Sequence, residues 1–180
     1  DKANQIINDV YELPRFEAVE IKNITWEEDP YNDKYWRFMF YSLQPENNLL
    51  YAGRETSGID KEKYNTKLME TVNSFIDDGM SKPHAWDDYH AVAFRTMVLT
   101  NTWWKLREQN ALSEDDSVKI LRALKIHGDF LADRNHYEPG YNHGINEAAA
   151  LFVLAINFPD MPGADNWLIV SKDRINSGLT

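Results

Sequence analysis

Apolar residues recur at intervals of three and four along most of this 180-residue chain, which is the spacing of an amphipathic α-helix. The clearest run is expected to begin after Asp60, acting as a helix cap, and to stop at Gly79. Its apolar positions are Tyr64, Leu68, Val72, Phe75 and Ile76. Because each helix must bury its apolar stripe against another element, a chain patterned in this way is expected to fold as packed helices.

Shorter apolar runs predict further helices on both sides of this one. An opening turn or two is expected over residues 3–10, before Pro14, and Pro45 is expected to interrupt or kink the helix that starts at Lys34. Ser113 followed by Asp116 resembles a capping box and predicts the start of another helix. The remaining predicted helices cover, approximately, residues 86–107, 113–133, 148–159 and 167–175.

Short connections join these helical runs, so the predicted fold class is all-α, built from successive antiparallel helical hairpins. One short extended segment, near residues 16–26, is the only part that resembles a strand, and it is too short to make a sheet alone. Such hairpins can form a bundle, a solenoid or an α/α toroid. The six Trp, nine Tyr and eight Phe favour the toroid, whose inner helix ends surround a sugar-binding cleft. Without a repeat or a long linker, residues 1–180 are expected to form a single helical domain.

The charge and composition of the chain exclude several classes of protein. The formal net charge of −10, with no cluster of Lys or Arg, argues against binding to nucleic acid. The absence of Cys excludes disulfides and thiolate catalysis, and no apolar run is long enough to predict a membrane-spanning helix. The sequence also lacks a glycine-rich phosphate loop, a dinucleotide fingerprint and the spacings of local metal sites. We therefore expect neither a cofactor nor a metal, and we expect His127, within a predicted helix, to be structural.

The first candidate site is Asn142-His143-Gly144, followed by Glu147, where a polar and aromatic loop leads into a helix. A histidine can take or give a proton near neutral pH, and an amide together with the free N–H groups of a helix start can hold an anion. This combination suits a substrate that carries a carboxylate. A structural reading is also open, in which Asn142 caps the helix, Gly144 allows a close approach and Glu147 favours the positive end of the helix dipole.

The second candidate site is the segment 86–90, Trp-Asp-Asp-Tyr-His, followed by Arg95 in an apolar stretch. Neighbouring positions on a helix point about 100° apart, so Asp87 and Asp88 cannot flank one glycosidic bond, and one of them is expected to be a helix cap. Arg95 needs an anionic partner. That partner is expected to be a carboxylate of the protein, from Asp87, Asp88 or Glu147, or else an acidic sugar.

Five motifs in order resemble the heparinase II/III family of polysaccharide lyases, which also includes alginate and oligoalginate lyases. They are residues 26–30 (Trp-Glu-Glu-Asp-Pro), residues 85–88 (Ala-Trp-Asp-Asp) leading to Arg95, residues 141–148 (Tyr-Asn-His-Gly-Ile-Asn-Glu-Ala), residues 157–160 (Asn-Phe-Pro-Asp) and Trp167. The resemblance covers most of the chain and is to the N-terminal α/α-toroid domain of the family. It implies that this chain forms part of an incomplete α/α toroid.

The resemblance implies β-elimination in a glycan that contains uronic acid: the carboxylate is neutralised, the proton H5 is abstracted and the 4-O leaving group is protonated. Asn142 is implied to hold the carboxylate, and His143 to act as a second donor or as the base. Arg95 is expected to bind an acid group of the substrate. We also expect substrate contacts from Tyr141, Trp86 and His90, and an orienting role for Glu147 and Asp88.

The family pattern also includes groups that this chain lacks. Its members resemble one another in using a Tyr on a later toroid helix and a His from a following β-sheet domain, whereas no Tyr follows His143 here. We therefore expect the chain to be the N-terminal part of a larger lyase and to be inactive alone. Its expected partners are an acidic polysaccharide or oligosaccharide and the downstream toroid and β-sheet domain of the same parent chain. From the resemblance alone, the expected location is a bacterial periplasm or the exterior.

Two other functions stay open at this point. An α/α-toroid glycoside hydrolase would use a carboxylate pair such as Asp88 and Glu147. A non-catalytic carbohydrate-binding helical domain would need no reactive group. The negative charge of the chain would repel a polyanion at long range, so either local positive potential around Arg95 or a less acidic substrate is expected.

Overall fold

The computed structural model describes residues 2–140 and 142–178, and helices make up most of them. The predicted all-α fold class is confirmed. In chain order the elements are α1 (Lys2–Ile7), β1 (Val10–Tyr11), β2 (Val19–Glu20), α2 (Lys34–Tyr41), η1 (Gln44–Glu46), α3 (Asn47–Glu55), α4 (Gly58–Asp77), η2 (Gly79–Ser81), η3 (Pro83–Ala85), α5 (Tyr89–Glu108), α6 (Glu114–Ala132), η4 (Arg134–His136), α7 (Asn142–Asn157) and α8 (Ala164–Gly178). No helix in the described parts of the chain is both long and apolar enough to cross a membrane.

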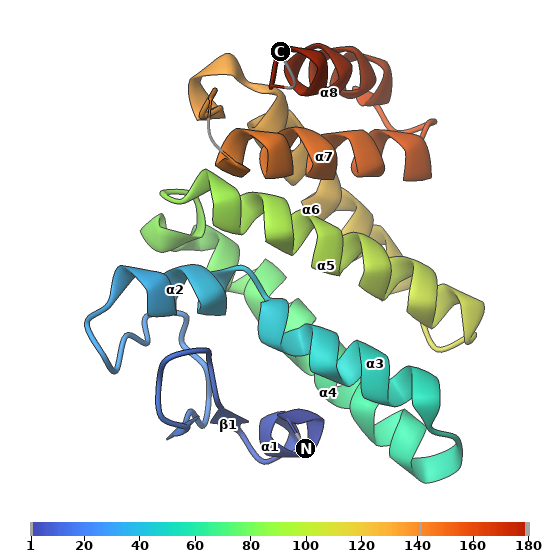
Figure 1. Ribbon diagram of the computed structural model, residues 1–180. Helices are drawn as coiled ribbons and strands as arrows, with labels where there is room; N and C mark the ends of the chain where they lie inside the picture. The colour runs from blue at the N-terminus through green and yellow to red at the C-terminus, as the bar shows by residue number, and fades with distance from the viewer. Residues whose placement is uncertain (1, 141, 179–180) are drawn as a thin grey trace.

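The long helices form successive antiparallel hairpins, α3 with α4, α5 with α6 and α7 with α8. Figure 1 shows α3, α5 and α7 together at the front of the molecule, with α4 and α6 behind them. Helix α5 packs against α7 on one side and against α2 and α3 on the other, while α6 contacts both α4 and α8. This two-layered array is the expected arc of an α/α toroid, and it brings α5 and α7 side by side.

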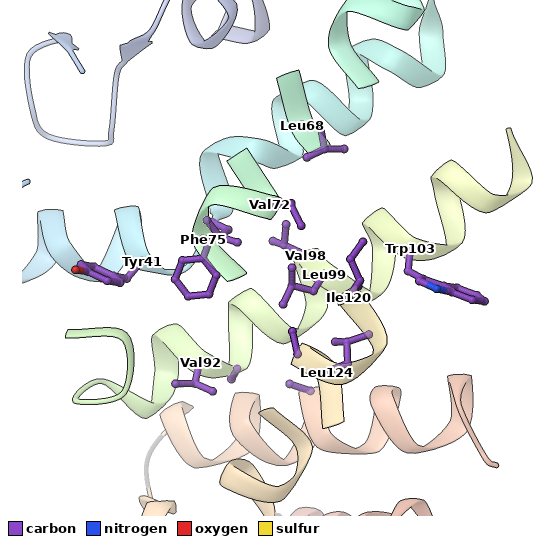
Figure 2. Packing of buried hydrophobic residues seen from close by; sticks show 14 of the residues in the cluster. Tyr41, Leu68, Val72, Phe75, Val92, Val98, Leu99, Trp103, Ile120 and Leu124 are labelled. Carbon is purple, nitrogen blue, oxygen red and sulfur yellow. The ribbon is translucent and has the colours of Figure 1, made fainter. Parts of the chain in front are cut away.

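A continuous apolar core joins the two layers. Leu68 and Val72 of α4, Leu99 of α5, and Ile120 and Leu124 of α6 are all 0% exposed. Figure 2 shows these side chains converging from their three helices. Burying a side chain of this size contributes about 1.5–3 kcal/mol, so these contacts hold α4, α5 and α6 together.

The beginning of the chain differs from the prediction. Helix α1 ends at Ile7, and Asp9 has a positive φ of 60°, which turns the backbone out of the helix. Val10, which the apolar spacing assigned to the opening helix, instead pairs with Glu20 in a two-stranded antiparallel ladder of β1 and β2. The extended segment predicted near residues 16–26 therefore contains a true strand, and its partner is the stretch that we had read as helix.

Side-chain caps fix where several helices begin. Asp33 caps α2 by accepting from the backbone N–H groups of Tyr35 and Trp36. Ser113 caps α6 by accepting from the N–H of Asp116, as predicted. The expected cap at Asp60 is wrong, because α4 already begins at Gly58, where φ is +63°. Asp60 lies inside the first turn of α4, where a carboxylate favours the helix dipole without capping it.

Candidate active site

A stacked pair of histidines marks the edge where α5 and α7 begin. His90 lies in the first turn of α5 and His143 in the first turn of α7. Their ring centroids are 4.2 Å apart with an interplanar angle of 23°. The two candidate segments of the sequence therefore meet at one place, a contact that no spacing in the sequence indicates.

Asn142 and His143 are both exposed to solvent. Asn142 lies within α7, so the structural reading in which Asn142 caps this helix is wrong. The free N–H groups of the helix start lie beside the Asn142 amide, and together they offer donors to an anion. Tyr141, the predicted substrate contact beside them, lies outside the described residues.

His90 is half-buried and held from two sides. The side-chain Nδ2 of Asn146 lies 2.8 Å from His90 Nε2, and the His90 ring stacks on Phe38 at 5.2 Å and contacts Phe94 at 4.7 Å. Burial and the neighbouring His143 lower the pKa of His90, which favours the neutral ring at neutral pH. With Asn146 as donor, His90 Nε2 accepts and its Nδ1 carries the hydrogen.

Glu147 supports His143 through the loop that precedes α7. Glu147 is 0% exposed, and its Oε2 accepts a hydrogen bond of 3.1 Å from the backbone N–H of Glu138. The side chain of Glu138 in turn places Oε2 3.2 Å from His143 Nδ1. A β-carbon at Gly144 would lie only 2.3 Å from the carbonyl oxygen of Glu138, so glycine is needed for the loop to come this close.

The carboxyl group of Glu147 has an incomplete set of partners. Its Oε1 is buried and has no hydrogen-bond partner, and burial raises the pKa of this carboxyl. The hydrogen bonds connect Glu147 to His143 through Glu138, and the orienting role of Glu147 stays a prediction. Asp88, the other residue expected to orient the site, caps α5 by accepting from the N–H of Ala91. Asp88 and the buried Glu147 are therefore engaged in structural contacts, which does not favour their use as a glycosidase pair.

Arg95 is fully buried, and its expected ion pair is wrong. Its three side-chain nitrogen positions donate to His127 Nε2 at 2.9 Å, to Tyr41 O at 2.6 Å and to Ala85 O at 2.7 Å. Carbonyl oxygens and a neutral imidazole thus replace the carboxylate that we expected. The guanidinium is 0% exposed and lies 4.6 Å from the Phe75 ring centroid, so the structure places it in the core and not on a surface that a sugar reaches.

His127 is the structural residue that we predicted. Its Nε2 accepts from Arg95, so its Nδ1 carries the hydrogen and donates to Ala123 O at 2.7 Å. Burial and the Arg95 charge lower the pKa of His127 to about 3, and burial lowers the pKa of Arg95 to about 9. The charge of the pair therefore stays on the arginine.

Trp86 closes the same buried cluster. Its indole N–H donates to Met80 O at 2.8 Å, and its ring packs on His127 and Phe130 with centroid distances of 5.0 and 4.9 Å. It is only partly exposed. Its polar group is thus already used within the protein.

Three contributors to the site carried no role in the sequence analysis. Asn146 lies four residues after Asn142, hence on the same face of α7, and this spacing is a signal that could have been used. Phe38 and Glu138 come from α2 and from a loop, and only the folded chain brings them to the histidines. Among residues 2–140 and 142–178, no three His, Asp or Glu side chains converge as ligands of a metal ion would.

Comparisons with known proteins agree with this arrangement. A family model described as the heparinase II/III N-terminus matches residues 4–180. Among solved structures, a heparan sulfate lyase HepC mutant from Pedobacter heparinus has a similar fold, with a TM-score of 0.85 at 17% identity. The match covers 97% of this chain and 28% of that protein, so the present chain spans less than a third of its length. No match is found among curated proteins.

Proposed function

The chain belongs to the heparinase II/III N-terminus family, and from this premise we propose that it is the N-terminal toroid segment of a polysaccharide lyase acting on glycans that contain uronic acid. The observation that carries the proposal is the stacking of His90 on His143, which follows the exposed Asn142 at the start of α7. The site offers an amide, an imidazole and the free N–H groups of a helix start within one exposed region.

These groups suit β-elimination. A base removes H5 of the uronate, the electron pair forms the C4–C5 double bond, and the C4–O4 bond breaks as O4 gains a proton. The proton next to a carboxylate is too weakly acidic to remove unless donors hold the negative charge that spreads onto that carboxylate. In the proposed reaction, Asn142 donates its amide N–H to the uronate carboxylate, and the N–H groups at the start of α7 add to this field.

His143 can act in this reaction as the base or as a second donor to the carboxylate, and its contacts are compatible with both roles. Its Nδ1 faces Glu138, which leaves Nε2 directed away from that contact. As a neutral ring it can take a proton at Nε2, and as an imidazolium it can donate to the carboxylate. His90, stacked on it and bonded to Asn146, fixes the plane of the ring.

We further propose that the segment is completed by downstream toroid helices and a β-sheet domain of its parent chain, which would supply the acid that protonates O4. The solved lyase of similar fold is more than three times as long as the match, which supports this reading. The 180 residues alone are then expected to have little or no lyase activity. A bacterial periplasmic or extracellular location is part of the same proposal.

The test is the absorbance at 232 nm of the unsaturated uronate product. The parent polypeptide is expected to produce it from a uronate polymer, and Asn142→Ala should lower its kcat by about 10²–10³-fold, the usual cost of losing one donor to a developing negative charge. Asn166→Ala, at an exposed position of α8, is the matched control and should keep full activity.

Two results would contradict the proposal. Full activity of the Asn142→Ala parent would remove the amide from the reaction and would favour a non-catalytic carbohydrate-binding domain. Strong product formation by the 180 residues alone would show that no downstream group is needed.

A further inference from the structure

Helix α5 leaves one narrow stripe of its surface unburied, which we call the α5 stripe. It consists of His90, Phe94, Met97, Asn101, Trp104 and Glu108, spaced three or four residues apart and hence on one face of the helix. The residues between them are mostly buried. The stripe runs from His90 in the candidate active site to Trp104, about 20 Å further along the helix at 1.5 Å per residue.

A cavity of about 500 Å³ lies at the far end of this stripe. It is lined by Trp104 and Asn101 of α5 and by Tyr51 and Asn47 of α3. Its volume is in the usual range of small-molecule sites. Tyr51 is 69% exposed and Trp104 is 39% exposed, so two aromatic rings from different helices face solvent within one cavity.

The polar groups of this cavity point to a ligand with hydroxyl and acid groups. Two amides, from Asn47 and Asn101, can donate to and accept from sugar hydroxyls. Two cations, Arg54 and Lys105, line the same cavity. Arg54 makes one ion pair, with the neighbouring Glu55 at 3.6 Å, in which both side chains are well exposed.

Such an exposed pair contributes little, so the guanidinium stays available to an external anion. A single carboxylate in the lining, that of Glu108, opposes the two cations. The local charge therefore favours an acidic ligand although the whole chain carries a net charge of −10. Aromatic faces pack against the C–H faces of sugar rings, and the amides and cations then match hydroxyl and acid groups.

We propose that this cavity, which we call the distal cavity, is a second glycan-binding site that holds a remote acidic unit of the same oligosaccharide that reaches His143. The inference rests on the proposed function and deepens it. The α5 stripe connects the two sites on one face, so one chain of several sugar units lies along it. Binding at the remote unit then helps to place the reacting unit without taking part in the chemistry.

The test uses the 180-residue chain and heparan sulfate oligosaccharides of defined length, with affinity measured by calorimetry. A dodecasaccharide is expected to bind at least tenfold more tightly than a disaccharide, because only the longer ligand spans both sites. Tyr51→Ala combined with Lys105→Gln should remove this advantage and leave disaccharide affinity within about twofold of the wild type. Tyr51 and Lys105 have partly or largely exposed side chains, and circular dichroism verifies that the variant is folded.

Matched controls exclude a general loss of charge or apolar surface. Lys63→Gln on α4 and Ile169→Ala on α8 change exposed residues away from the α5 stripe and should leave both affinities unchanged. A dodecasaccharide that binds the Tyr51 and Lys105 variant as tightly as the wild type would overturn the distal cavity. So would a wild-type affinity that does not depend on length.

The proposed function fails by a different measurement. If Asn142→Ala leaves product formation by the parent intact while the length advantage depends on Tyr51 and Lys105, the distal cavity stands and the proposed reaction site falls. Suppose instead that the parent forms the 232 nm product and that Asn142→Ala abolishes it. If the Tyr51 and Lys105 variant then binds the dodecasaccharide as tightly as the wild type, only the distal cavity is wrong.

Discussion

Two histidine contacts on either side of α5 show how differently the same side chain behaves in two surroundings. His127 meets Arg95 in the core, where both residues are 0% exposed and each ring nitrogen has a partner. His90 meets His143 at the edge where α5 and α7 begin, and the two rings have the side chains of Asn146 and Glu138 as polar partners. Arg95 and His90 are only five positions apart on α5. They point to different faces of this helix, so one side chain lies in the core and the other at the site.

The difference teaches that a charged residue in an apolar stretch need not be a ligand-binding group. The Arg95 guanidinium donates to the last residue of two elements, to Tyr41 O at the end of α2 and to Ala85 O at the end of η3. Its role is to join α2 and η3 to α5. His90 and His143 have side-chain partners instead, Asn146 and Glu138, and the exposed His143 is available for chemistry.

The largest expected effect comes from breaking the buried contact. Arg95→Met should lower the free energy of unfolding by about 3–5 kcal/mol, because two buried carbonyls and His127 lose their donor together. Urea unfolding followed by circular dichroism measures this. A loss below about 1 kcal/mol would mean that water or a neighbouring donor replaces the guanidinium. Arg122→Met, an exposed arginine of α6, is the matched control.

A smaller effect, of about 2 kcal/mol at pH 5, is expected from titrating the buried imidazole. The pKa of His127 is lowered to about 3 in the folded chain, so between pH 6.5 and pH 3 the unfolded chain binds the extra proton. The free energy of unfolding should then fall as pH is lowered through this range, by about 1.4 kcal/mol per pH unit well below 6.5. His127→Gln should remove this slope.

The comparison must be made as a difference between wild type and His127→Gln. Glu46 is buried with one oxygen unpartnered, and burial raises its pKa to about 8, so its contribution has the opposite sign and falls as pH rises from 4.5 to 8. Subtracting the two curves cancels this contribution. Parallel curves for wild type and variant would contradict the assigned protonation of His127.

The smallest effect on stability is expected at the exposed pair. His143→Ala should change the free energy of unfolding by no more than about 0.5 kcal/mol, because the side chain is exposed and has one polar contact. The same substitution in the parent polypeptide should strongly reduce product formation at 232 nm. A large loss of stability with unchanged activity would mean that His143 is a structural residue and not part of the reaction site.

The sequence is sufficient to predict features that depend on residues close together along the chain. The caps at Ser113 and Asp88, the interruption at Pro45 and the helical hairpins all follow from local spacing, and the structure has each of them. The ladder at Val10 was missed because apolar spacing over so few residues fits a helix as well as a strand.

The contacts that define the site could be predicted only in part. Asn142, His143 and Glu147 belong to one motif, and the structure exposes the first two and buries Glu147, while their roles stay predictions. The partners of Arg95 could not be derived, because backbone carbonyls carry no signature in the sequence and are delivered by packing. The stacking of His90 on His143 is likewise a product of the α5 and α7 interface.

The hydrogen bond from Glu138 to Glu147 gives the loop before α7 an anchor inside the protein. Since the space beside Gly144 admits no additional carbon, the loop can change its outer residues but not its path. Diversity among related chains should thus accumulate at exposed outer positions such as Pro139, while the imidazole behind the loop keeps its position. The buried carboxyl group of Glu147 would in this way separate loop positions that tolerate substitution from the backbone path that does not change.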